Sequence, residues 1–222
     1  MKAIRSPRVK ICCIGSVEKA ALAVEAGASA LGLVSKMPSG PGVISDQLIA
    51  EIAATVPPAI GTFLLTCCQN VDEIVAQQHA CRTNTIQICD HLTAGTHREL
   101  KQALPGISVV QVIHVTGPES VDEAAQVAPL VDAILLDSGN QKLAVKELGG
   151  TGRTHDWSLS RTIRERVHVP LFLAGGLTAE NVAQAIEDVG PFGVDLCSSV
   201  RTDGRLDAEK LKRFFSAARG PC

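Results

Sequence analysis

Two residues capable of acid–base chemistry stand near the ends of short apolar runs that lie far apart in the chain. Cys12 lies in the first of these runs, and Asp137 directly follows the sixth. A thiolate and a carboxylic acid that face each other across a pocket can act as general base and general acid. A nearby cation or helix N-terminus would favour the thiolate. Spacing alone favours a plainer alternative, in which Cys12 is a core residue and Asp137 caps a loop.

Small residues at two later points indicate an anion site. Gly175 and Gly176 follow the seventh apolar run, and Ser198 and Ser199 follow the eighth. Paired glycines let backbone N–H groups approach a phosphate closely, and a helix predicted to begin near Thr178 would direct its positive end there. Because both loops carry the signal, we predict a phosphate site; a tight turn at the two glycines is the alternative.

A long glycine-rich loop that runs to Asp156 is a third candidate. Its segment 149–157 contains three glycines, the cationic Arg153 and the only tryptophan of the chain, Trp157. A mobile loop of this kind can cover a ligand and exclude water. A solvated connector is the alternative, and Asp156 itself is better explained as the N-cap of the next helix.

The elements that must position these residues repeat one unit, an apolar run followed by a stretch of helical periodicity. The runs are short, β-branched and apolar along nearly their whole length, which is typical of strands buried on both faces. We predict strands over 9–14, 30–34, 60–65, 85–89, 107–115, 131–136, 169–174 and 193–197. We predict helices over 16–27, 46–56, 71–79, 97–104, 120–128, 156–167, 178–187 and 208–218.

Eight such units without a break in composition predict an α/β fold, a single (β/α)8 TIM barrel domain over residues 1–222 with a core of about 8–218. In that fold the loops after the strands build the active site, and those after the seventh and eighth usually grip phosphate. A doubly wound open sheet is the alternative. The first turn lacks G-x-G-x-x-G, so a nicotinamide cofactor is not expected.

The composition excludes several classes of function. The 222 residues carry a net charge of −2 and only 3% aromatic residues, so we expect no nucleic-acid partner, by charge or by base stacking. No apolar run approaches the ~18 residues of a membrane span, so we expect a cytoplasmic protein without a membrane partner. The spacing of the eight cysteines fits neither a zinc site nor a disulfide framework.

Four groups of motifs occur in a distinctive order along the chain. They are Val9-Lys10-Ile11-Cys12, Leu135-Leu136-Asp137, Gly149-Gly150-Thr151-Gly152 with Asp156-Trp157, and Ala174-Gly175-Gly176-Leu177 with Asn181-Val182. In order and spacing, from residue 9 to about 218, the chain resembles the phosphoribosylanthranilate isomerase family. The resemblance implies a barrel isomerase of tryptophan biosynthesis that needs no cofactor and no metal, and that exists as a monomer or homodimer.

The resemblance also implies roles for individual residues in an Amadori rearrangement of N-(5-phosphoribosyl)anthranilate. Asp137 would protonate the ribose ring oxygen, and Cys12, as a thiolate, would remove the C2 proton of the Schiff base that forms. The residues expected to bind the phosphorylated substrate, at the phosphate site and on nearby strands, are Gly175, Gly176, Ser198, Ser199, Gln87 and Asp195.

The chain departs from the family pattern mainly at the anthranilate end. The family has Cys-Gly where this chain has Cys12-Cys13, and its arginine after the second strand, taken to hold the anthranilate carboxylate, has no counterpart in the loop 38–45. Lys36 or Arg153 is expected to hold the carboxylate instead. After the eighth strand, Arg201 stands where the family has a glutamate.

These departures leave two other functions open. One is a related barrel isomerase acting on a different phosphorylated sugar or aldose amine. The other is a non-catalytic protein that binds a phosphorylated metabolite, although such a protein would need neither Cys12 nor Asp137. With no tyrosine in the chain, Phe63 and Trp157 are the aromatic residues considered for stacking on an anthranilate ring.

Overall fold

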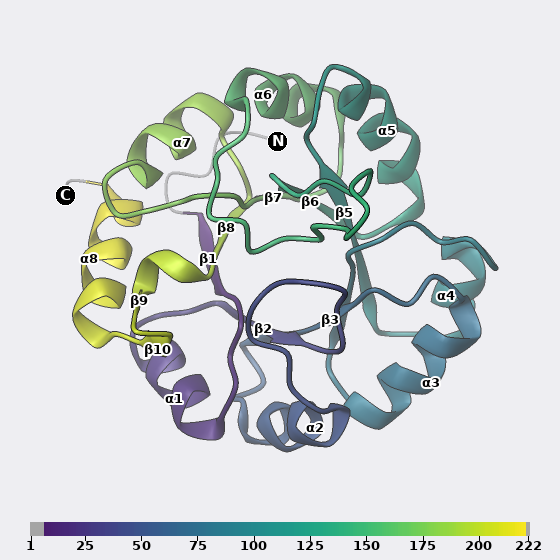
Figure 1. Ribbon diagram of the computed structural model, residues 1–222, viewed down its shortest axis with the longest axis horizontal. Helices are drawn as coiled ribbons and strands as arrows, with labels where there is room; N and C mark the ends of the chain where they lie inside the picture. The colour runs from purple at the N-terminus through teal and green to yellow at the C-terminus, as the bar shows by residue number, and fades with distance from the viewer. Residues whose placement is uncertain (1–6, 221–222) are drawn as a thin grey trace.

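Eight parallel strands form a closed barrel inside a ring of eight α-helices in the computed structural model, which describes residues 7–220 (Figure 1). The strands are β1 Arg8–Ile11, β2 Ala30–Val34, β3 Gly61–Thr66, β4 Thr85–Ile88, β5 Ser108–His114, β6 Ala133–Asp137, β7 Leu171–Leu173 and β8 Gly193–Leu196. The helices are α1 Val17–Glu25, α2 Asp46–Thr55, α3 Val71–Cys81, α4 His97–Ala103, α5 Glu119–Val127, α6 Trp157–Arg166, α7 Val182–Val189 and α8 Ala208–Arg219. Each strand pairs with its neighbours in chain order, and β1 pairs with β8 to close the ring. The predicted (β/α)8 barrel is confirmed; the predicted domain, 1–222, extends past the described residues at both ends.

Two predicted boundaries differ from the structure by three residues or more, for local reasons. The first strand ends at Ile11 rather than residue 14, because Cys13 adopts a left-handed conformation with φ of 60° and turns the chain out of the sheet. Helix α7 begins at Val182 rather than near Thr178. There the Asn181 side chain accepts from the Thr178 N–H and donates to the Gly176 carbonyl, which holds residues 178–181 in a turn.

Several short elements were not predicted. They are the 3₁₀ turns Ala128–Leu130 and Ser198–Val200, and a small hairpin formed by β9 Arg201–Thr202 and β10 Arg205–Leu206. Elements of two or three residues are too short to show a periodicity in the sequence. The 3₁₀ turn after β8 carries Ser198 and Ser199, two residues of the predicted phosphate site.

Alternation along the strands divides the buried side chains into two cores. Side chains such as Ile11, Leu31 and Leu64 point outward and pack under the helices. Alternate side chains fill the barrel interior, where Phe63, Phe172 and their neighbours form a separate cluster. Every second strand residue therefore points into the barrel interior. This interior opens at the carboxyl ends of the strands.

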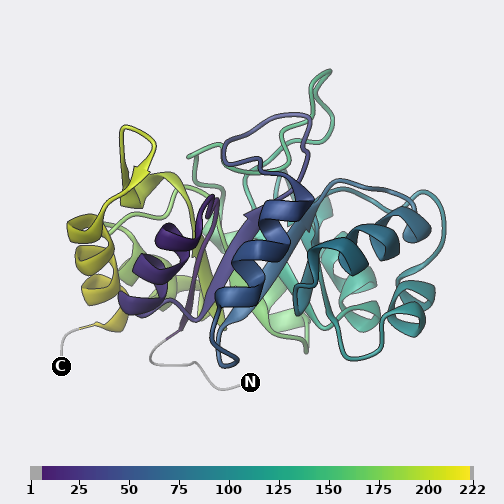
Figure 2. The same cartoon turned by 90° about the horizontal axis from the view of Figure 1, so that it is seen from below.

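Two loops rise above that open end (Figure 2). They are the β2–α2 loop, 35–45, and the β6–α6 loop, 138–156. The hydroxyl of Ser39 donates to the carbonyl of Lys146 over 2.7 Å and joins the two loops. The Lys146 ammonium in turn pairs with the buried Asp90 carboxylate at the end of β4, 2.5 Å away. These two contacts hold the loops to each other and to the barrel, so the loops together cover its open end.

None of the helices described between residues 7 and 220 is long and apolar enough to cross a membrane.

Candidate active site

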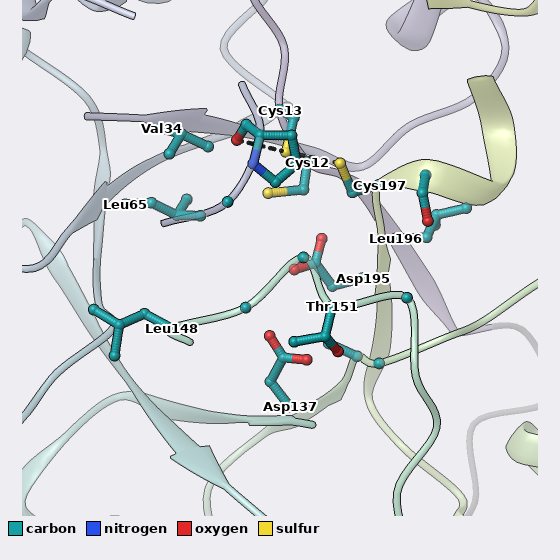
Figure 3. A pocket seen from close by; sticks show the side chains of 18 of the residues that line it. Cys12, Cys13, Val34, Leu65, Asp137, Leu148, Thr151, Asp195, Leu196 and Cys197 are labelled. Atoms are coloured by element: carbon teal, nitrogen blue, oxygen red, sulfur yellow. Dashed lines mark hydrogen bonds between the residues drawn. The ribbon is translucent and has the colours of Figure 1, made fainter. Parts of the chain in front are cut away.

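A cavity of about 240 Å³ opens at the carboxyl ends of the strands, under the two loops (Figure 3). It contains eight of the ten predicted site residues: Cys12, Gln87, Asp137, Gly175, Gly176, Asp195, Ser198 and Ser199. Cys12 and Asp137 come from β1 and β6, which lie on opposite sides of the barrel, and both project into the cavity (Figure 3). The structure thus brings the thiol and the carboxyl into one pocket.

The Asp137 carboxyl is held at the last residue of β6 with 9% of its surface exposed. One of its oxygens accepts the backbone N–H of Ser138 over 2.7 Å. The other lies against Gly149, where an added Cβ would come within 2.7 Å of it. The Ser138 and Thr151 hydroxyls, 2.7 Å apart, fasten the covering loop beside the carboxyl. The Ser138 N–H therefore orients the Asp137 carboxyl, and the absence of a side chain at Gly149 leaves space for it.

The Cys12 thiol lies beside a buried ammonium group. Lys10, two residues earlier on β1, has no exposed surface, and its Nζ lies 2.8 Å from Asp195 Oδ2 on the neighbouring β8. An added Cβ on Gly32 would lie 2.9 Å from Cys12 Sγ and 3.1 Å from Lys10 Nζ, so both groups flank this glycine. Cys12 contributes electrostatically to the pKa of Lys10, so the two groups are close enough to interact.

The ion pair between Lys10 and Asp195 keeps Lys10 charged. Burial alone would lower the pKa of Lys10, but the negative charges of Asp195 and Cys12 outweigh that effect and raise it. Burial raises the pKa of Asp195, while Lys10 opposes the rise. The ammonium therefore persists at neutral pH as a fixed positive charge inside the barrel, beside Asp195 and Cys12 of the pocket wall.

Three buried polar atoms on residues that line the pocket have no hydrogen-bond partner within the described residues 7–220: Gln87 Oε1, Asp195 Oδ1 and Ser199 Oγ. Leaving such an atom unpaired costs roughly 1–3 kcal/mol, so unpaired groups that gather in one pocket indicate a polar ligand. Ser199 lines the same pocket as Gly175 and Gly176, the other residues at which the phosphate was predicted. The predicted helix end at Thr178 does not contribute, since α7 begins at Val182.

The two glycines after β7 have conformations that other residues rarely adopt. Gly175 has φ of 85° and Gly176 φ of 60°. At Gly176 an added Cβ would lie 2.7 Å from the backbone nitrogen of Thr154 in the covering loop. The glycines therefore let the β7 end and the β6–α6 loop meet by their backbones beside the pocket.

We expect Gly176→Ala to raise the KM for a phosphorylated substrate about tenfold or more, because the new Cβ displaces the loop backbone and tenfold corresponds to only ~1.4 kcal/mol. Gly190→Ala is the matched control. Gly190 has nearly the same φ, 64°, but no atom within 4 Å of an added Cβ, so both variants carry the left-handed strain of roughly 1–2 kcal/mol. Steady-state kinetics and thermal unfolding separate the effects: equal KM values in the two variants would contradict the assignment.

Lys36 and Arg153 do not line the pocket. Both are exposed on the covering loops, and the Arg153 guanidinium pairs with Glu147. The pocket wall nearest these loops is largely apolar and includes Val34, Met37, Leu65 and Leu148.

The aromatic residues considered for stacking also lie outside the pocket wall. The Phe63 ring packs edge-on against Phe172, with centroids 5.8 Å apart, and lies 5.3 Å from Lys10 Nζ. These residues line a separate hollow at the opposite, amino-terminal end of the barrel. Trp157 is the first residue of α6.

Lys10, which lies beside Cys12, was not singled out from the sequence. A lysine inside an apolar run, two residues before Cys12, points to the same side of a strand as Cys12, and that spacing could have found it. Its register partner Asp195 could not have been paired with it from the sequence, because 185 residues separate the two.

Comparisons with known proteins agree on one family. The model of the family described as N-(5'-phosphoribosyl)anthranilate (PRA) isomerase matches residues 9–217. N-(5'-phosphoribosyl)anthranilate isomerase 2 of Methanosarcina mazei is 35% identical over 214 residues, which cover 96% of this chain and 94% of the relative. The Natronomonas pharaonis isomerase is 36% identical over 215 residues, 96% of this chain and 98% of that one.

Solved structures give the same result. The phosphoribosylanthranilate isomerase of Thermotoga maritima superimposes with a TM-score of 0.80 at 31% identity, covering 97% of this chain and 100% of the other. A phosphoribosylanthranilate isomerase solved with reduced 1-(o-carboxyphenylamino)-1-deoxyribulose 5-phosphate superimposes with a TM-score of 0.77 at 30% identity, with the same coverage. Another Thermotoga maritima structure is described as monomers generated from a dimeric isomerase.

Proposed function

The chain belongs to the N-(5'-phosphoribosyl)anthranilate isomerase family, and we propose that its Asp137 and Cys12 carry the acid and base steps of that isomerisation. The reaction is the Amadori rearrangement of N-(5-phosphoribosyl)anthranilate in tryptophan biosynthesis. It moves hydrogen within one molecule, so a proton donor and a proton acceptor on the two sides of the sugar account for the chemistry.

Asp137 begins the reaction as a general acid. It gives its proton to the ribose ring oxygen, the C1–O bond breaks, and the nitrogen lone pair forms a protonated Schiff base at C1. Cys12, as a thiolate, then removes the proton from C2, and the electrons of that C–H bond move to neutralise the Schiff-base nitrogen. The enolamine that results tautomerises to the ketone. Each well-placed proton transfer contributes ~10²–10⁴-fold to the rate.

The substrate's orientation follows from the two ends of the pocket. Its phosphate lies against the backbone of Gly175 and Gly176 and against Ser198 and Ser199, where the buried Ser199 hydroxyl still lacks a partner. Its aromatic ring then lies toward the apolar wall that includes Leu65 and Leu148. In this orientation C1 and C2 of the sugar lie between the acid and the base.

The observation that carries this proposal is the Cys12 thiol beside the Lys10 ammonium, opposite the oriented Asp137 carboxyl, in one pocket. Turnover of phosphoribosylanthranilate by the purified wild-type chain, followed by loss of the substrate's fluorescence, tests it. Absence of turnover while inorganic phosphate or a phosphate ester still raises the melting temperature would overturn the activity and leave only a phosphate-binding protein.

The carboxylate of the substrate needs a cation, and Lys36 and Arg153 are our candidates. We expect Lys36→Met to raise KM about tenfold or more, since a hydrogen bond to a charged group contributes ~1.5–3 kcal/mol. Arg153→Met should have a smaller effect, because Glu147 already engages its guanidinium. Steady-state KM values of the two variants and the wild type check this order. Unchanged KM in both variants would show that neither residue holds the carboxylate.

The proposed activity also bears on where the protein is located and how it assembles. A biosynthetic isomerase of a phosphorylated metabolite belongs in the cytoplasm, where we place it. Monomer and homodimer are the two states we expect, and light scattering on the eluting protein distinguishes them.

A further inference from the structure

Two cysteines that the proposed mechanism does not use meet at the rim of the pocket. Cys13 follows β1 and Cys197 follows β8, and both thiols are free. Their sulfur atoms lie 2.8 Å apart although 184 residues separate them in the chain (Figure 3). A disulfide bond has a sulfur–sulfur distance of ~2.05 Å, so only a small shift separates this pair from a covalent link.

Arg201 holds the backbone on both sides of the pair. Its guanidinium donates to the carbonyl oxygens of Cys12 over 2.7 Å and Cys13 over 3.0 Å, and also to that of Cys197. The β2–α2 loop closes the other side: an added Cβ on Gly42 would lie 2.5 Å from Cys13 Cβ. The pair therefore lies where two strand ends and a covering loop converge, next to Cys12.

The pKa values of the two thiols are shifted in opposite directions, and that of Cys13 is raised by its hydrogen bonds with Cys12 and Cys197. The hydrogen bond that joins Cys197 to Cys13, aided by the charge of Arg201, lowers the pKa of Cys197. Burial raises the pKa of Cys67, Cys81 and Cys89, so these three stay thiols. A cysteine with a lowered pKa, next to an arginine and with a second thiol in contact, is an arrangement in which oxidation to a disulfide is favoured.

We propose that Cys13 and Cys197 form a peroxide-responsive dithiol, and that their disulfide reversibly lowers turnover at the adjacent site. The Cys197 thiolate attacks one oxygen of a hydroperoxide, the O–O bond breaks, and the departing oxygen takes a proton to give water or an alcohol. The Cys13 sulfur gives up its proton, attacks the sulfur of the sulfenic acid and displaces its oxygen as water. Two thiols are thereby oxidised by two electrons, and a dithiol reductant reverses the change.

The disulfide would affect turnover by changing the positions of residues at the ends of β1 and β8. Bringing the sulfurs together draws the β1 end toward the β8 end, and Cys12 and Ser198 are the residues directly adjoining Cys13 and Cys197. A displacement of about 1 Å at a reacting centre can cost ~100-fold, and we expect a loss of about tenfold or more. This effect rests on the proposed function, whereas formation of the bond does not.

Hydrogen peroxide treatment of the full chain, followed by alkylation and tryptic mass spectrometry, tests the bond itself. We expect a cross-link between peptides 11–19 and 167–201, reversed by dithiothreitol. Because peptide 11–19 contains both Cys12 and Cys13, two variants assign the partner: the link should persist in Cys12→Ser and disappear in Cys13→Ser. Absence of the link in the wild type, or its persistence in Cys13→Ser, overturns the pairing.

Turnover measured on the same samples tests the control of activity. Reduced Cys197→Ser should turn over like the reduced wild type, and peroxide should cause no dithiothreitol-reversible loss in it. Direct oxidation of Cys12 would instead inactivate wild type and Cys197→Ser alike. A cross-link that forms without loss of turnover overturns the control of activity, and leaves both the pairing and the proposed isomerase function intact.

Discussion

Asp137→Asn should lower kcat by about 10²–10⁴-fold, the contribution of a well-placed general acid, with little change in KM. An amide has no acidic proton to give to the ribose ring oxygen. Its carbonyl can still accept the Ser138 N–H that now holds the carboxyl, and its shape is nearly the same, so the fold and the pocket are preserved. A fall in kcat at constant KM is the sign of an interaction made only in the transition state.

Asp132→Asn is the matched control, because Asp132 precedes the same strand at its other end. Its carboxyl accepts the Val109 N–H over 2.9 Å and pairs with Lys101 over 2.5 Å, at the amino-terminal face of the barrel. The same substitution there should change thermal stability and leave kcat unaltered. A wild-type kcat in Asp137→Asn would contradict its role as the acid, and an equal loss in both variants would indicate a general effect on folding.

The barrel was predictable because its strands are buried on both sides. The apolar composition of a run such as 30–34 indicates that burial, and the predicted bounds of this strand are those of the structure. The same logic predicted that Cys12 and Asp137 share one face, since strand ends in a closed barrel meet there, and both line one pocket. The direction of a loop is not contained in the sequence: Lys36 and Arg153 lie on the two covering loops, yet neither lines the pocket.

Residues that depart from regular geometry were the hardest to predict. Cys13 ends the first strand early through a left-handed conformation that cysteine seldom adopts. The neighbouring residues in the sequence do not predict this conformation. That conformation also carries its sulfur to Cys197. The start of α7 was misjudged because Thr178 is a good capping residue by type, whereas Asn181 forms the local hydrogen bonds that delay the helix.

Cys12→Ser and Cys12→Ala should each lower kcat by about 10²–10⁴-fold, since each removes the group that takes the C2 proton. A serine hydroxyl occupies nearly the same space but does not ionise near neutral pH, so Lys10 has no thiolate to stabilise. Both variants should still bind inorganic phosphate, because Gly175, Gly176 and Ser199 are unchanged. Steady-state kinetics together with thermal shift in phosphate measure the two properties independently.

The plainer interpretation of Cys12, as a buried core residue, predicts a different pattern. Cys12 has only 8% of its surface exposed and packs within the interior cluster, so a purely structural role would make alanine and serine differ in stability while both kept their turnover. Cys13→Ser, assayed under reducing conditions, is the control, because it removes the adjacent thiol and should keep a kcat near that of the wild type. If Cys13→Ser lost as much kcat as Cys12→Ser, the base would not be Cys12 alone, and the roles of the two neighbouring thiols would have to be exchanged or shared.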